Sequence, residues 1–240
     1  MGDGFATVPV MIAPLPDYWL PRPPIPTDST SLAAFDQLFE DAVQQGGEIN
    51  YRLAAPRWQF ACYIADTRPV LLHGSGDAQI KRFEPRQPND TTEFGNQLAV
   101  YAASDGVWPL YYAILDRGRH PMSMINASVR AVDDDGSSSL PHYYFSISAP
   151  ALAARAFRPG TLYFLPRTTF RQQPDTQFHG QLVRVDHWAS PEAVVPLCQL
   201  TVTPDDFPHL GQIRGHDDAT TLARARANPD GFPWIEAGNP

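Results

Sequence analysis

Residues 70–114 contain the side chains of this sequence best suited to hold a flat, polar ligand. The stretch reads VLLHGSG, a loop, FGNQLAVYAASDG and then VWPLYYAI. His73 followed by Gly-Ser-Gly places a polar ring beside backbone that a ligand can approach closely. Tyr101 lies in an apolar segment and Tyr112 follows eleven residues later. Two tyrosines brought together in this way can stack on both faces of a planar ring.

Two strands and a helix are expected to position these side chains. Residues 68–73 and 98–103 are apolar enough to form central strands, so His73 stands at a strand end and Tyr101 within a strand. Apolar residues then recur with helical period over 104–117. That helix would carry Tyr112, with Ser104 or Asp105 as its N-cap.

The rest of the chain predicts many short strands and few helices. Residues 51–64 indicate a mixture of strand and turn, and Asp133–Ser139 indicates a loop between two strands. Further helices are expected at 31–43, 149–157 and 217–227, and further strands at 123–132, 142–148, 161–165, 181–188 and 196–202. This distribution predicts an α+β domain.

The stretch 70–114 resembles the nicotinamide pocket of the ADP-ribosyltransferase superfamily, in particular the poly-ADP-ribose polymerase-like and rifampin ADP-ribosyltransferase-like branches. Those proteins carry a strand ending in His-Gly-Ser/Thr, a loop, a Gly-(x)-hydrophobic-Tyr-x-Ala strand and a helix. In the polymerase-like members a second tyrosine follows at the interval seen for Tyr112. The resemblance implies an ADP-ribosyltransferase-like split β-sheet core with few peripheral helices, and NAD as the substrate.

The resemblance also implies a role for each residue of the motif. His73 would hydrogen-bond a ribose hydroxyl of NAD, and the backbone of Gly74, assisted by Ser75, would hold the carboxamide. Tyr101 and Tyr112 would enclose the nicotinamide ring. The alternative is that His73 is a core histidine and that both tyrosines are packing residues.

The catalytic carboxylate of the family has no direct counterpart. In the polymerase-like branch a glutamate opens a strand and stabilises the positive charge that develops on the ribose. The corresponding position here is Gln181, which can hydrogen-bond the ribose but brings no charge. Glu192, in the following loop, or Asp186 could supply a carboxylate, although on a regular strand Asp186 faces away from Gln181 unless a bulge intervenes. An ordinary solvated polar face is the alternative for all three.

Composition excludes several other classes of protein. The formal net charge is −8, with 18 basic and 26 acidic residues, which argues against a nucleic-acid partner. The seven histidines show no metal-ligand spacing, so no metal site is expected. Cys62 and Cys198 are expected to be buried thiols. Because Lys81 is the only lysine and Ala and Pro abound, the composition is typical of a GC-rich bacterium.

The organisation of the chain is predicted as two parts. Residues 1–50 are expected to form a proline-rich extended segment plus one helix packed on the core, and residues 51–240 the ADP-ribosyltransferase-like domain. Tyr18 and Trp19 indicate that the segment packs on the domain surface; a free tail is the alternative. Since neither a signal peptide nor a membrane-spanning stretch is recognised, we expect a soluble cytoplasmic protein, with delivery to another cell as a toxin or effector left open.

Three functional hypotheses remain. The first is a mono-ADP-ribosyltransferase-like enzyme, or an NAD glycohydrolase, that cleaves nicotinamide from NAD and transfers ADP-ribose to an unknown protein or small-molecule acceptor. The second is a non-catalytic NAD- or ADP-ribose-binding module that has lost the acid. The third is a relative of the tRNA 2′-phosphotransferases, against which the acidic charge argues. Oligomeric state is not predicted.

Overall fold

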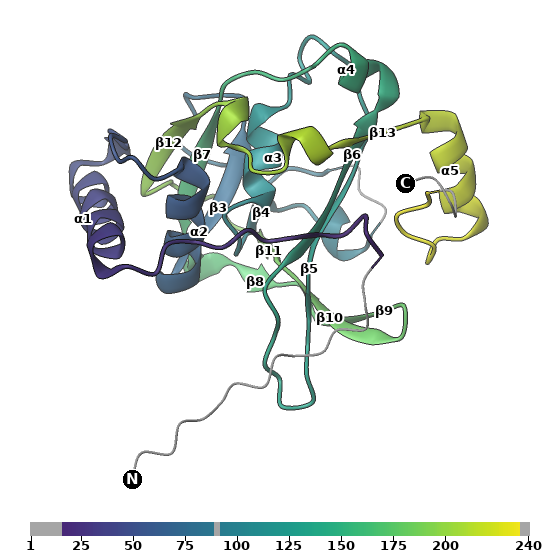
Figure 1. The fold of residues 1–240 in the computed structure, drawn as a ribbon, viewed down its shortest axis with the longest axis horizontal. Helices are drawn as coiled ribbons and strands as arrows, with labels where there is room; N and C mark the ends of the chain where they lie inside the picture. The colour runs from purple at the N-terminus through teal and green to yellow at the C-terminus, as the bar shows by residue number, and fades with distance from the viewer. Residues whose placement is uncertain (1–15, 89–91, 236–240) are drawn as a thin grey trace.

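The computed structural model describes residues 16–88 and 92–235, which form five α-helices and two β-sheets (Figure 1). The helices are α1 (Ser29–Gln45), α2 (Arg57–Thr67), α3 (Trp108–Ile114), α4 (Ala149–Ala153) and α5 (Asp218–Ala227). The α+β class expected from the sequence is therefore confirmed. Within the described ranges, no helix has the length and apolar character that crossing a bilayer requires.

The larger sheet contains seven strands in the spatial order β2, β12, β7, β3, β4, β11, β8. In that order they span Gly47–Glu48, Cys198–Val202, Gly160–Pro166, Val70–Ser75, Val100–Ala103, His187–Ser190 and Arg171–Gln172. β3 is antiparallel to β7 along its whole length but pairs with β4 only at Leu72 and Ala103. The strand that carries His73 is therefore central, and its C-terminal half separates from β4.

The smaller sheet contains six strands, with β1, β6, β5, β10 and β9 as neighbours and β13 paired with β6 as well. These strands are Leu20–Pro21, His142–Ser148, Met124–Ala131, Gln181–Val185, Thr176–Phe178 and Arg214–His216. β5 and β6 form the long hairpin that extends downward in Figure 1. The expected strands at 123–132 and 142–148 are thus confirmed.

Helix α3 lies between the two sheets and joins them. On one side Leu110 shares a buried cluster with Leu72 and Leu162 of the larger sheet. On the other side the hydroxyl of Tyr111 donates to the carbonyl of Ser146 in β6 at 2.8 Å. Because both faces of α3 are covered, six of its seven residues are buried.

The expectation for residues 51–64 was wrong. This segment contains most of α2, whose residues from Trp58 to Ile64 are largely buried against α1 and β3. Its apolar side chains lie on more than one face of the helix, so the sequence lacks the periodicity by which an amphipathic helix is recognised. The expected helix at 31–43 is confirmed as α1, which begins at Ser29. Asp28 caps this helix, because its carboxylate accepts a hydrogen bond from the amide of Ser31 at 2.8 Å.

The expected strand at 181–188 is two strands in different sheets. β10 ends at Val185 in the smaller sheet, and β11 begins at His187 in the larger one. Asp186, between them, accepts a backbone bond from Ser104 and donates its own amide to Ser128. The chain therefore crosses between the sheets at this residue.

The described part of the N-terminal segment packs on the domain surface and is not a free tail. Trp19 is buried, and its ring contacts Tyr144 of β6 and Phe178 of β9 edge-on. Leu20–Pro21 then forms β1 at the edge of β6. The expectation for residues 1–15 lies outside the described residues.

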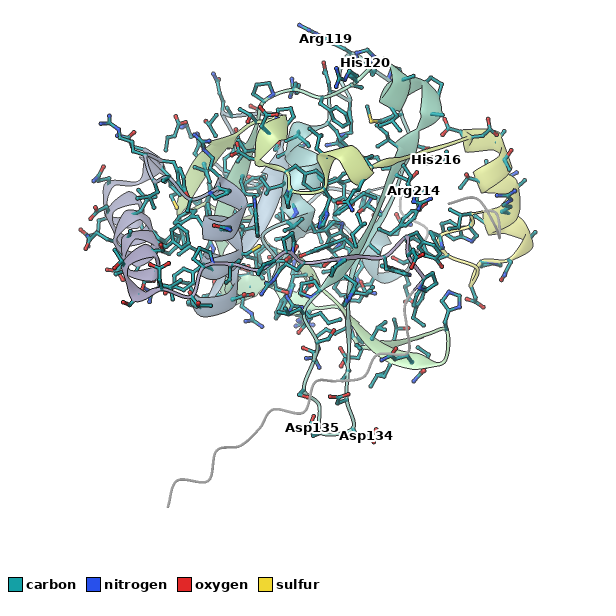
Figure 2. All side chains as sticks on the ribbon, viewed as in Figure 1. Arg119, His120, Asp134, Asp135, Arg214 and His216 are labelled. Atoms are coloured by element: carbon teal, nitrogen blue, oxygen red, sulfur yellow. The ribbon has the colours of Figure 1, made fainter. Side chains whose placement is uncertain are left out.

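Helix α5 has no buried residue and is anchored at its first turn instead (Figure 2). Asp218 accepts from the hydroxyls of Ser123 at 2.6 Å and Ser148 at 2.7 Å. His216, immediately before the helix, lies 2.7 Å from the same Ser123 hydroxyl. This polar network fixes the start of the helix to β5 and β6.

Candidate functional site

His73 is bonded to the neighbouring strand through its ring. Its Nδ1 lies 2.7 Å from the carbonyl oxygen of Tyr101. Because a carbonyl oxygen only accepts, Nδ1 carries a proton, and in the neutral ring Nε2 keeps a lone pair. Burial lowers the pKa of His73, the Tyr101 carbonyl opposes this, and the charges of Arg117 and Arg86 lower the pKa further. His73 is therefore neutral near pH 7 and can accept a hydrogen bond from a hydroxyl group.

Gly74 allows the backbone of α3 to lie directly against β3. A Cβ atom at Gly74 would be 1.7 Å from the carbonyl oxygen of Pro109 and 2.9 Å from the amide nitrogen of Ala113. Gly160 of β7 meets the same helix, because its Cβ would be 1.9 Å from the carbonyl oxygen of Ala113. The glycine that follows His73 thus sets the distance between the strand and the helix that carries Tyr112. Ser75 closes the turn, where its hydroxyl accepts from the amide of Asp77 at 3.0 Å.

Tyr101 is held at both ends of its side chain. Its hydroxyl accepts from the amide of Gln97 at 2.8 Å and lies 3.0 Å from the carbonyl oxygen of Phe94, to which it can donate. Its ring stacks on the imidazole of His187, with centroids 5.0 Å apart and planes at 28°. The ring is consequently oriented by the loop before β4 and by the first residue of β11.

Tyr112 and Trp108 share one acceptor on the smaller sheet. The hydroxyl of Tyr112 donates to Oδ1 of Asn126 at 2.7 Å, and Nε1 of Trp108 donates to the same atom at 2.6 Å. The two rings are 6.3 Å apart, as expected for residues one turn apart on a helix. Asn126, from β5, therefore fixes both side chains of α3 with one oxygen atom.

His187 connects the two tyrosines. Besides stacking on Tyr101, its ring meets that of Trp108 at 5.7 Å and that of Phe94 at 5.3 Å, both edge-on. A continuous series of ring contacts thus runs from Tyr101 through His187 and Trp108 to Tyr112. We refer to these four residues together with His73 as the ring cluster; they come from β3, β4, β11 and α3.

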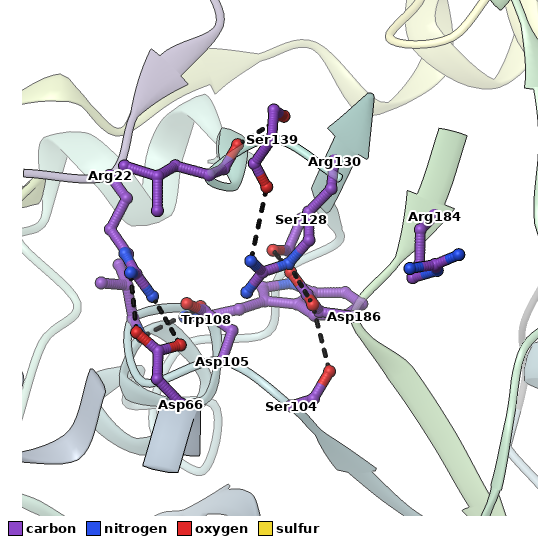
Figure 3. Close-up of polar contacts among 12 residues, drawn as sticks. Arg22, Asp66, Ser104, Asp105, Trp108, Ser128, Arg130, Ser139, Arg184 and Asp186 are labelled. Carbon is purple, nitrogen blue, oxygen red and sulfur yellow. Dashed lines mark hydrogen bonds and ion pairs between the residues drawn. The ribbon is translucent and has the colours of Figure 1, made fainter. Parts of the chain in front are cut away.

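Asp186, next to His187, is the centre of a buried polar network (Figure 3). Its carboxylate accepts from Nε of Arg130 at 2.7 Å, from the Ser128 hydroxyl at 2.8 Å and from the Ser104 hydroxyl at 3.0 Å. Burial raises the pKa of Asp186 to about 6, because it outweighs the opposing charge of Arg130, and Asp105 raises it further. These bonds join the ends of β4 and β10 to the second half of β5, and they hold the crossing point that places His187 in the larger sheet.

Gln181 and Glu192, the other acid-site candidates, lie in different surroundings. Gln181 opens β10 in the smaller sheet, opposite Phe178 of β9. Glu192 is exposed in the turn after β11, where its amide is bound by the Ser190 hydroxyl at 3.2 Å. The residue that opens the strand beside β4 is His187. The structure therefore bonds the His73 ring to the backbone of Tyr101, and the same ring lies against Phe83, with centroids 4.7 Å apart. Tyr112 is linked to the Tyr101 ring through Trp108 and His187, whereas Gln181 stands in the other sheet.

Sequence reasoning missed His187, Trp108, Asn126 and Arg130. Trp108 could have been found, since it precedes Tyr112 by four positions and so shares a face of the expected helix with it. His187 carried no such signal, because a single long strand had been expected across it. Asn126 and Arg130 alternate with apolar residues on a strand, which is also the pattern of a solvated face.

The geometry defines a limited set of chemical abilities. Aromatic rings from three elements can stack on a planar ligand, and a neutral imidazole can accept a hydroxyl proton in a hydrogen bond. Within the described residues, no group of three or more His, Cys, Asp or Glu side chains could hold a metal ion. Comparisons with protein-family models, with curated proteins and with solved structures found no match for this chain.

Proposed function

We propose that this protein binds NAD at the ring cluster, releases nicotinamide and transfers ADP-ribose, and that its two sheets form an ADP-ribosyltransferase-like core. The observation that carries the proposal is the contact between His73 and Tyr101 at 2.7 Å, with His187 stacked on the tyrosine ring. The neighbouring strands β3 and β4 thus carry a hydroxyl acceptor, His73, and an aromatic ring, Tyr101. A nicotinamide riboside needs both.

Each part of the ligand has a chemical partner in this proposal. Nε2 of His73 accepts a hydrogen bond from a ribose hydroxyl, and the nicotinamide ring stacks on the aromatic side chains. The bond between the nicotinamide nitrogen and the ribose carbon breaks, and nicotinamide leaves with the electron pair. An acceptor nucleophile then bonds to that carbon and releases its proton. With water as the acceptor, the products are ADP-ribose, nicotinamide and a proton.

A non-catalytic NAD-binding module is the second candidate, and one observation favours it. The strand that pairs with β4 opens with His187, an imidazole, while the adjacent Asp186 carboxylate is committed to Arg130 and two serines. Without a carboxylate directed at the ribose, the rate of bond cleavage falls by roughly 100- to 1,000-fold. Binding would remain, because stacking and hydrogen bonding need no charge.

Release of nicotinamide from NAD, followed by chromatography, tests the enzymatic proposal. We expect His73→Ala to lower the rate at least about 100-fold, because it removes the hydroxyl acceptor. His179→Ala, in the exposed turn between β9 and β10, serves as the control and should retain activity. NAD left intact by concentrated wild-type protein would sink the enzymatic proposal.

The two candidates are separated by a thermal-shift experiment with millimolar NAD. A raised melting temperature without nicotinamide release supports the binding module. His187→Glu and Gln181→Glu each restore a carboxylate at one of the two strand-opening positions, and turnover gained in either variant identifies where the acid is needed. Identical melting with and without NAD would contradict both candidates.

A further inference from the structure

The side-chain amide of Asn126 has its orientation fixed by the two residues of α3 that it binds. The indole Nε1 of Trp108 can only donate, and it lies 2.6 Å from one end of the amide, so that end is the oxygen atom. The hydroxyl of Tyr112 donates to the same oxygen at 2.7 Å. These two donors use both lone pairs of Oδ1. The Nδ2 atom, at the other end of the amide, keeps two N–H groups to donate.

The Nδ2 atom of Asn126 is open to solvent. Among the described residues it has no hydrogen-bond acceptor, since both bonds of the side chain are made by its oxygen. In the described part of the chain, the enclosed polar side-chain atoms that lack a partner belong to Arg57, Arg68, His142, Arg158, Trp188 and His209. Asn126 is not one of these residues. Its two free N–H groups are therefore accessible to a ligand.

Asn126 lies on the face of β5 that is directed at α3. Successive side chains of a strand alternate, so Asn126 shares this face with Ser128, whose hydroxyl binds Asp186. Asp186 directly precedes His187 of the ring cluster. Asn126 is half-buried, as are Tyr112 and His187. An oriented amide donor thus stands beside the ring cluster.

Gly74, to which the family resemblance assigns the carboxamide of the ligand, packs on the opposite side of α3. A Cβ atom at Gly74 would be 1.7 Å from the carbonyl oxygen of Pro109, so the helix backbone lies directly against this glycine. Trp108 and Tyr112 are directed at β5 instead. Because the hydroxyl of Tyr112 is held at Asn126, a ligand ring that stacks on Tyr112 lies beside this amide.

An uncharged amide donor beside aromatic rings suits a planar ligand that carries a carbonyl group. The ligand ring stacks on the aromatic side chains, and its carbonyl oxygen, in or near the plane of the ring, accepts the N–H group. The carboxamide of nicotinamide is a neutral acceptor of this kind. A ring without a carbonyl group would leave Nδ2 bound only to water.

We propose that Nδ2 of Asn126 donates a hydrogen bond to the carbonyl oxygen of a carboxamide-bearing ring held at the ring cluster. This inference rests on the proposed function, since that function places the nicotinamide ring at these side chains. Asn126 then has two roles. Its oxygen positions Trp108 and Tyr112, and its nitrogen selects rings that carry a carbonyl group.

Calorimetric titration with nicotinamide and with 3-acetylpyridine tests the inference. Both are neutral planar rings with a carbonyl oxygen, but only nicotinamide also carries N–H donors. Asn126→Asp keeps an oxygen for Trp108 and Tyr112 and removes the donor, so 3-acetylpyridine should bind about 10-fold more weakly. Nicotinamide affinity should change less than about threefold, because the N–H group of the ligand donates to the new carboxylate.

Asn50→Asp is the matched control. It makes the same chemical change at an exposed position after β2, an edge strand of the larger sheet. The oxygen of Asn50 also accepts a hydrogen bond, from Nε of Arg52 at 3.1 Å. Both ligands should bind Asn50→Asp as they bind the wild-type protein.

A second measurement uses the wild-type protein and so does not depend on the folding of a variant. In NMR spectra recorded during titration, the side-chain N–H signals of Asn126 should move further downfield with 3-acetylpyridine than with 3-ethylpyridine. The two ligands have similar shapes and rings, but only 3-acetylpyridine can accept the hydrogen bond. Equal shifts with both ligands would contradict the inference.

Two results of the titrations would overturn the inference. Equal losses of nicotinamide and 3-acetylpyridine in Asn126→Asp would mean that the amide only holds the two rings of α3 in place. Affinity for 3-acetylpyridine within about twofold of wild type in this variant, or no binding of either ring to the wild-type protein at millimolar concentration, would also exclude the contact.

Failure of this inference and failure of the proposed function give different results. Release of nicotinamide from NAD that depends on His73, with equal effects of Asn126→Asp on both ligands, keeps the enzyme and removes the Asn126 contact. A loss confined to 3-acetylpyridine, in a protein that leaves NAD intact, keeps the contact and removes the enzymatic proposal.

Discussion

At the scale of single residues, His73 and Asp186 illustrate how burial acts on an imidazole and on a carboxyl group. Burial disfavours the charged form of each, so the pKa of His73 falls and that of Asp186 rises to about 6. His73 is left neutral with an accepting nitrogen, which suits a ligand hydroxyl. Asp186 accepts hydrogen bonds from three side chains, and these bonds hold the two sheets together at the point where the chain crosses between them.

The raised pKa of Asp186 predicts how stability depends on pH. In the unfolded chain this carboxyl ionises near pH 4, whereas in the folded protein it ionises near pH 6. Between those values the folded state binds the additional proton, so the contribution of Asp186 to the free energy of unfolding is present below about pH 4 and is lost as the pH rises to about 6. Denaturant titrations should show wild-type stability falling relative to Asp186→Asn by roughly 2–3 kcal/mol across this range.

Asp175→Asn provides the control for that measurement. Asp175 pairs with Arg184 near the surface at 2.8 Å, so its loss should change the free energy of unfolding by less than about 1 kcal/mol. Wild-type stability that stays constant or rises relative to Asp186→Asn between about pH 4 and 6 would show that Asp186 is not the titrating group.

At the scale of elements, the packing of α3 on the larger sheet depends on two glycines. Gly74 and Gly160 each face the helix backbone at distances that exclude a Cβ atom. Because the α3 backbone lies directly against β3 and β7, this seven-residue helix contacts both sheets. Its Trp108 and Tyr112 then donate to the same acceptor, Asn126.

Gly74→Ala should therefore be strongly destabilising. The added methyl group must displace the α3 backbone, which costs about 3 kcal/mol or more in the free energy of unfolding. Gly211→Ala is the matched control, because no atom lies within 4 Å of its Cβ position, and it should cost less than about 1 kcal/mol. Equal melting temperatures for both variants would mean that the helix moves freely against the strand.

At the scale of the whole molecule, both thiols are enclosed by the core that unites the helices and the larger sheet. Cys62 of α2 and Cys198 of β12 are buried and unbonded. Burial raises the pKa of both thiols, that of Cys198 to about 12. Neither has an appreciable thiolate fraction in the folded protein, so reaction with a thiol reagent must await opening of the core.

Labelling with a chromogenic disulfide checks this prediction. Two thiols should react rapidly in denaturant, and the native protein should react at least about 100-fold more slowly. Ser137→Cys, in the exposed loop between β5 and β6, should add one thiol that reacts rapidly in the native state. Rapid labelling of Cys62 or Cys198 in native protein would show that the core opens locally.

Local sequence was sufficient for the elements whose signal is periodic or apolar. The helix at 29–45, the strands around His73 and Tyr101, and the β5–β6 hairpin follow from hydrophobic spacing, because one face or both faces of each element must be buried. The sequence also predicts that His73, Tyr101 and Tyr112 line one site, and this stays a prediction: the His73 ring meets the backbone of Tyr101, and Tyr112 reaches the Tyr101 ring through Trp108 and His187. Helix α2 was missed because it is apolar on several sides.

Only the tertiary structure decided which residues meet. Asp186 interrupts what reads as one strand, since its carboxylate finds Arg130 and two serines from distant segments, and this crossing brings His187 onto Tyr101. The backbone bonds from Arg158 to Ile114 and from Asp116 to Ala156 likewise join segments about forty residues apart. Contacts of this kind depend on how the two sheets are placed relative to each other. The spacing of apolar residues along the chain is a local property and carries no information about that placement.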